Sequence, residues 1–125
     1  MQPRDGQRLE HIADYCDDIR DALDSLDNAF AAFSADKKAQ YAVAFSLLQI
    51  GELVGKLSDE LKDGTKEEID WPAIKSLRNI IAHDYGAIRL SILWNIASED
   101  IPALRAFCEA HLNDIPPREG EKNSC

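Results

Sequence analysis

Four residue types suited to phosphodiester chemistry lie within eight positions of this chain: Arg78, Asn79, His83 and Tyr85. Arginine carries a permanent charge in a planar fork, which suits phosphate oxygens and the charge that develops on them in a transition state. Histidine titrates near neutral pH, so it can take a proton from a 2′-hydroxyl or give one to a leaving oxygen. Asparagine can orient either group. The stretch therefore has the parts for RNA cleavage, although arginine and histidine on a helix surface are more often structural.

Helical spacing separates residues 71–85 into two faces. The apolar face predicts core positions at Ile74, Leu77, Ile80 and Ile81. A separate polar face holds Lys75, Arg78, Asn79, Ala82 and His83. Tyr85 follows Arg78 by seven residues and therefore lies at the edge of the polar face. Asp84 falls on the apolar side, so we expect the helix to loosen before Gly86.

One histidine cannot easily serve as base and acid in the same step. A symmetric homodimer that brings two such helices together would place two copies of Arg78 and His83 in one cleft. It would also concentrate positive charge on an acidic protein, whose net charge is −9. Residues 71–94 hold three basic residues against Asp84 alone, whereas most other segments are acidic. Broad nucleic-acid binding is therefore unfavourable, and a phosphate-bearing substrate must be met in a confined site.

The elements that position this face are predicted to be helices in a single domain, residues 1–113. Apolar residues recur every three or four positions over about 5–33, 37–61, 71–85 and 89–112. Phe30, Tyr41 and Ile92 are among the residues that this spacing predicts to face the core. Pro102 interrupts the last stretch, so we expect a kink there or a short fifth helix. This pattern predicts an all-α, up-and-down four-helix bundle. The Pro- and Gly-containing residues 114–125 are predicted to form a disordered tail.

Three further features bear on the class of protein. Gly51 and Gly55 lie one turn apart inside the second predicted helix, which suggests that another helix packs closely there. The aspartates of the first helix indicate a solvated face, with a metal site as the alternative. Cys16, Cys108 and Cys125 lack metal-ligand spacing and are expected to be reduced thiols of a cytoplasmic protein. No segment is long and apolar enough for a membrane helix.

The sequence around the motif resembles the HepT-like family of HEPN-domain proteins over about residues 8–113. The resemblance rests on a central Arg-x4-His-x-Tyr, Arg78 to Tyr85, with matching segments before and after it. These segments are Leu48–Glu52, Trp71–Ile74, Leu93–Ile96 and Ile101–Leu104.

The resemblance implies a metal-independent ribonuclease without a cofactor that works as a homodimer on an RNA substrate. It further implies the toxin of a toxin–antitoxin pair, silenced when a minimal nucleotidyltransferase antitoxin transfers AMP from ATP to Tyr85. By this likeness Arg78 stabilises the phosphate, His83 is the acid/base and Asn79 orients. Lys75 and Glu52 are candidate cleft residues, and a helix–helix salt bridge is the alternative role for Glu52.

Two other functions remain open from the sequence. The chain could be a non-catalytic subunit of a two-component nucleotidyltransferase, using the same basic cleft to hold a nucleotide or substrate. It could also be a dimeric scaffold, for which substitutions on the polar face would have no effect.

Overall fold

The computed structural model describes residues 2–113, and every regular element in this range is helical. Residues 114–125, predicted to be a tail, and Cys125 with them, lie outside the described part. In chain order the elements are α1 (Pro3–Asp24), α2 (Phe30–Ser34), α3 (Lys37–Lys56), α4 (Asp59–Gly64), α5 (Trp71–Asp84), the 3₁₀ turn η1 (Tyr85–Ala87), α6 (Leu90–Asn95), the π-helical turn η2 (Ile96–Asp100) and α7 (Ile101–Asn113).

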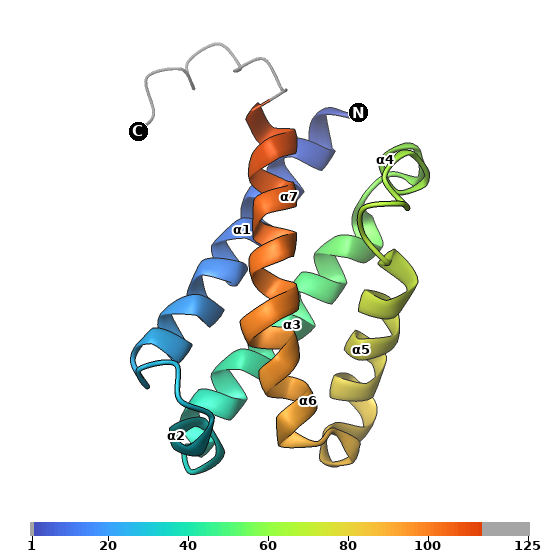
Figure 1. Cartoon of the computed structure of the whole chain (residues 1–125). Coiled ribbons are helices and arrows are strands. Elements are labelled where there is room, and N and C mark those ends of the chain that lie inside the picture. The colour runs from blue at the N-terminus through green and yellow to red at the C-terminus, as the bar shows by residue number, and fades with distance from the viewer. Residues whose placement is uncertain (1, 114–125) are drawn as a thin grey trace.

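The long helices α1, α3, α5 and α7 form the predicted all-α bundle (Figure 1). Helix α1 packs against both α3 and α7, and α5 packs mainly on α3. The interior of the bundle is a single apolar cluster that includes Leu9, Ile12, Phe33, Ile50 and Leu93. None of the helices in the described range is long and apolar enough to cross a membrane.

The first helix is shorter than predicted. It ends at Asp24 instead of continuing to Phe33, and α2 begins separately at Phe30. Asp27 and Asn28 lie between the two helices with φ angles of 55° and 54°, in the left-handed region. Aspartate and asparagine tolerate this conformation better than other non-glycine residues. The apolar spacing misled the prediction because Phe33 is still buried after the turn.

The second predicted helix also divides in two. Helix α3 ends at Lys56, and Ser58 caps α4 by accepting a hydrogen bond from the Leu61 amide at 3.1 Å. The buried carboxylate of Asp5 fixes this junction, because it accepts from the Ser58 amide at 2.9 Å and from the Ser58 hydroxyl at 2.6 Å. The start of α1 is thereby tied to the end of α3.

The predicted interruption near Pro102 is confirmed. Proline has no amide hydrogen and cannot donate to the carbonyl four residues earlier, that of Ser98. The chain adjusts by widening into η2 just before α7, a common way for a helix to absorb such a defect.

Several residues predicted to be in the core are exposed instead. Tyr41 is 56% exposed, Ile80 43% and Ile92 49%, and Phe30 is exposed as well. Helical spacing identifies the direction of the apolar stripe, but it cannot tell how much of that stripe a neighbouring helix covers. Cys16 and Cys108 are free thiols in the core, as expected.

Candidate active site

Helix α5, which carries the motif, is fixed most firmly at its first turn. The Asp70 carboxylate caps it by accepting from the Ala73 amide at 3.1 Å. The buried Trp71 indole donates to the Thr65 hydroxyl at 3.0 Å, and its ring packs edge-on against Phe107 of α7 with centroids 5.5 Å apart. Beyond Trp71, only Ile81 of α5 is fully buried. The polar face predicted for this helix is thus left open.

Arg78 of α5 packs tightly against α3 at Gly51. A Cβ atom added to Gly51 would lie 2.4 Å from the Arg78 Cβ and 2.6 Å from its Cγ. The absence of a side chain at Gly51 therefore allows the contact, which confirms the close helix packing predicted there. Gly55 has no atom within 4 Å of its added Cβ, so the prediction is wrong for the second glycine.

Two side chains hold the Arg78 guanidinium. Its Nε donates to Glu52 Oε1 at 2.6 Å, and its Nη2 forms an ion pair with the same oxygen. Its Nη1 donates to Asn79 Oδ1 at 3.1 Å. Glu52 therefore forms the helix–helix salt bridge that was one of its two predicted roles. Arg78 has five N–H donors, so a donor on each terminal nitrogen remains for a phosphate oxygen.

The other residues of the predicted polar face are exposed. Lys75, Asn79 and His83 all lie on the solvent side of α5. Within residues 2–113 the His83 side chain has no hydrogen bond, so its ring nitrogens are free to meet a substrate or a second subunit. Arg78 and His83 are five residues apart, which separates them by about 7.5 Å along the helix axis.

Tyr85, predicted to lie at the edge of the polar face, turns inward instead. It begins η1, and its side chain packs against the hydrophobic core. Its hydroxyl is shielded from solvent and has no hydrogen-bond partner among the described residues. Burial raises the pKa of Tyr85 above its ordinary value, and nearby Tyr41 raises it further. The Tyr41 and Tyr85 rings lie 5.9 Å apart between centroids.

Two exposed aromatic side chains lie on α3, and one of them contacts the motif. Tyr41 and Phe45 are one turn apart on α3, and each is 56% exposed. Tyr41 contacts Tyr85, while Phe45 packs against Tyr15 of α1 with centroids 6.5 Å apart. Large exposed aromatics next to a polar site are typical of surfaces that another protein covers. Sequence reasoning missed this feature because Tyr41 was assigned to the core.

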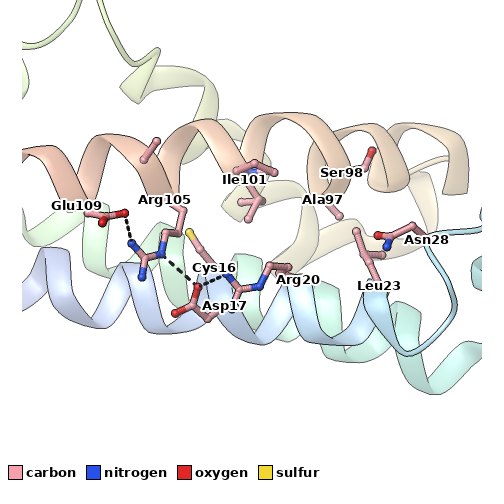
Figure 2. A pocket seen from close by; sticks show the side chains of 12 residues that line it. Cys16, Asp17, Arg20, Leu23, Asn28, Ala97, Ser98, Ile101, Arg105 and Glu109 are labelled. Atoms are coloured by element: carbon pink, nitrogen blue, oxygen red, sulfur yellow. Dashed lines mark hydrogen bonds and ion pairs between the residues drawn. The ribbon is translucent and has the colours of Figure 1, made fainter. Parts of the chain in front are cut away.

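Three cavities of the described residues lie away from the motif, one of them an open, polar hollow of about 480 Å³ between α1 and α7 near Glu10 and Leu112. The other two are more enclosed. One, of about 320 Å³, opens between α1 and α7, where Arg105 donates to Asp17 at 3.2 Å and to Glu109 at 2.8 Å (Figure 2). The other, of about 410 Å³, lies among α3, α5 and α7 and is largely apolar. Neither is lined by Arg78, Asn79 or His83; Asn79 and His83 are exposed on the surface of the single chain, and Arg78 is half-buried.

Metal-ligand clusters were the alternative for the acidic run of α1. Among residues 2–113 no group of three or more histidine, cysteine, aspartate or glutamate side chains is placed to hold a metal ion. Asp17 instead pairs with Arg20 at 3.3 Å and with Arg105 of α7.

An all-helical bundle that presents Arg-x4-His on a solvent-facing helix defines a class of HEPN-like proteins. The family described as "Ribonuclease HepT-like" matches residues 12–111. The chain therefore belongs to the HepT-like ribonuclease family, and the predicted resemblance is confirmed.

Curated relatives agree with this assignment. "Probable ribonuclease HepT" of Thermococcus cleftensis is 32% identical over 101 residues, covering 77% of this chain and 91% of that protein. "Putative RNase MJ0127" of Methanocaldococcus jannaschii is 32% identical over 111 residues, covering 88% of each chain. No solved structure matches the chain significantly.

Proposed function

We propose that this chain is an endoribonuclease that cleaves RNA without a metal ion, with Arg78 and His83 as its catalytic residues. The observation that carries the proposal is the fixed guanidinium of Arg78, held by Glu52 and Asn79 on the same helix, α5, as the exposed His83. The family membership and the ribonuclease names of the relatives support the same activity.

The reaction has a simple balance. The 2′-oxygen attacks the adjacent phosphorus while a base takes the hydroxyl proton. The bond from phosphorus to the 5′-oxygen breaks, and an acid protonates that oxygen. The products are a 2′,3′-cyclic phosphate and a 5′-hydroxyl. Arg78 stabilises the charge on the phosphate oxygens, and Asn79 keeps the guanidinium in place. Lys75, exposed on the same helix, adds positive charge to the approach of the RNA.

A homodimer supplies what a single chain lacks, a second histidine for the opposite proton transfer. The open site of one subunit supports this arrangement, as do Tyr41 and Phe45, which would otherwise remain in water. Two copies of Arg78 and His83 would then face one cleft.

The physiological role we propose is that of a toxin whose antitoxin is a minimal nucleotidyltransferase. Its switch is the transfer of AMP from ATP to Tyr85, which places a bulky anion near Arg78. Tyr85 directly follows α5, which carries Arg78, and it contacts Tyr41 on α3, the helix that carries Glu52.

RNA cleavage by matched histidine variants tests the catalytic proposal. His83→Ala and Arg78→Ala are each expected to lower cleavage by at least about 100-fold, with EDTA present throughout. His11→Ala removes an exposed histidine of α1 and is expected to leave cleavage unchanged. Equal cleavage by His83→Ala and wild type would contradict the assignment.

A second candidate function uses the same surface without catalysis. The chain could bind nucleotide or substrate for a nucleotidyltransferase through Arg78 and Lys75, because an open arginine with free donors suits a phosphate. Nucleotide binding by a purified protein that never cuts RNA, even at high concentration, would favour this function.

A further inference from the structure

Tyr41 and Tyr85 are in contact, and they differ in exposure. Tyr41 is exposed, whereas the Tyr85 hydroxyl is shielded from solvent. Tyr41 is 56% exposed, and the centroid of its ring lies 5.9 Å from that of Tyr85, with the two rings inclined by 56°. The Tyr85 hydroxyl is shielded and makes no hydrogen bond within residues 2–113. The oxygen that the proposed function assigns as the AMP acceptor is therefore not accessible in this conformation.

Transfer of AMP requires that this oxygen reach a second protein. The Tyr85 oxygen must form a bond to the α-phosphorus of ATP while the bond from that phosphorus to the pyrophosphate breaks. The phenolic proton passes to a base of the transferase or to water. An attacking oxygen must come within about 3–3.5 Å of its target, which a buried hydroxyl cannot do. The Tyr85 side chain has to rotate outward first.

The local structure favours such a movement. Outside the core the hydroxyl would regain hydrogen bonds to water that it lacks inside, so only packing holds it in place. Tyr85 begins the short 3₁₀ turn that follows α5, where the chain leaves the regular helix. The next residue, Gly86, has no atom within 4 Å of an added Cβ, which leaves room for the turn to shift.

We propose that Tyr41 is a gate that sets how often Tyr85 becomes available for modification. This inference rests on the proposed function of Tyr85 as the AMP acceptor. The Tyr41 ring holds Tyr85 in the closed position, and its displacement releases the hydroxyl to solvent. Tyr41 is a positioning residue in this scheme and touches neither the RNA nor the reacting atoms.

Acetylation by N-acetylimidazole tests the gate without any partner protein, because the reagent acetylates accessible tyrosine hydroxyls. Peptide mass spectrometry of the folded protein gives the rate at each tyrosine. In wild type we expect Tyr85 to react slowly. Tyr41→Ala is expected to raise the Tyr85 rate roughly three- to tenfold, the change in open population expected for one lost aromatic contact.

Phe45→Ala is the matched control. Phe45 lies on the same helix, is equally exposed and packs against Tyr15 rather than Tyr85. It reproduces any general effect of losing an exposed ring from α3, including weaker self-association, and should leave the Tyr85 rate unchanged. Tyr41→Phe keeps the ring and should restore the wild-type rate. Equal Tyr85 rates in wild type and Tyr41→Ala, or the same increase in both alanine variants, would overturn the gate.

Co-expression with the nucleotidyltransferase then separates the two proposals. If opening limits modification, AMP should accumulate on Tyr85 faster in Tyr41→Ala than in wild type. Equal rates of AMP transfer would show that the gate does not control modification. If acetylation responds to Tyr41→Ala but no variant ever carries AMP, the gate stands and the assignment of Tyr85 as acceptor fails.

Discussion

Gly51 lies directly against Arg78, so closely that a methyl group on Gly51 would approach the Arg78 Cβ to 2.4 Å. A tight contact between α3 and α5 therefore lies at the candidate catalytic arginine. The neighbouring residue, Glu52, reaches the guanidinium from the same turn of α3. Two consecutive residues of α3 therefore hold Arg78: Gly51 packs against the base of its side chain, and Glu52 binds its guanidinium.

We expect Gly51→Ala to displace Arg78 and to lower RNA cleavage by about 10- to 100-fold, because small misplacements of catalytic groups have large effects. The added methyl group should also destabilise the fold by about 1–3 kcal/mol through overpacking. Gly55→Ala is the control, since its methyl group meets nothing. It should stabilise α3 by up to about 1 kcal/mol and leave cleavage intact. Urea unfolding and RNA cleavage assays of both variants test this expectation. Equal stability and equal cleavage rates of the two variants would refute the close contact of Gly51 with Arg78.

Glu52→Ala should affect activity more than stability. The ion pair with Arg78 is partly exposed, so its loss should change the free energy of unfolding by less than about 1 kcal/mol. The guanidinium would lose its main anchor, and we expect kcat to fall by about tenfold with a smaller change in KM. Steady-state cleavage of a short RNA measures both. Faster cleavage by Glu52→Ala would mean instead that the carboxylate competes with the phosphate.

Mixing two inactive variants tests whether the site spans two subunits. A dimer of one Arg78→Ala and one His83→Ala chain retains one arginine and one histidine in a shared cleft, so we expect partial activity above either parent. A site confined to one subunit has no intact copy in such a mixture. Cleavage after subunit exchange that stays at the level of the parents would therefore argue against the composite site.

The two buried thiols predict a loss of stability at alkaline pH. Burial raises the pKa of Cys16 and of Cys108 from 9.0 to about 12, and for Cys16 the proximity of Cys108 adds to the effect. Unfolded chains therefore release these protons first. The stabilising effect is complete below pH 9 and disappears as pH rises toward 12, at up to about 1.4 kcal/mol per pH unit and thiol. Urea unfolding between pH 8 and 10.5 should show a smaller slope for the Cys16→Ala, Cys108→Ala double variant; identical slopes would exclude the thiols as the cause.

Helical periodicity predicted most of the bundle because the apolar spacing of each long helix is regular. It failed where two separate helices, α1 and α2, present apolar residues at the spacing of one continuous helix. The left-handed turn at Asp27 and Asn28 breaks the helix, yet Phe33 still reaches the core. The Asp-Asn pair and the Ser58 cap were local signals for the breaks that periodicity overrode.

The motif from Arg78 to Tyr85 could be recognised in the sequence, but the contacts that hold its side chains could not be predicted from it. The pairing of Glu52 with Arg78 joins residues 26 positions apart. Helical spacing predicts only how residues of one helix lie relative to each other. Helical spacing predicts Tyr85 at the edge of the polar face of α5 only if the helix continues through this residue. The helix ends at Asp84, and the 3₁₀ turn rotates Tyr85 toward the core.

The shallow burial of α5 has a consequence for folding cooperativity. Only two of its residues, Trp71 and Ile81, are fully buried, whereas α1 and α3 each bury eight or more. Segments with few buried apolar contacts open locally at a free energy below that of global unfolding. In native-state hydrogen exchange, amides of α5 beyond its first turn should thus lose protection while α1, α3 and α7 remain closed. The helix that carries the candidate chemistry would then form a foldon of its own.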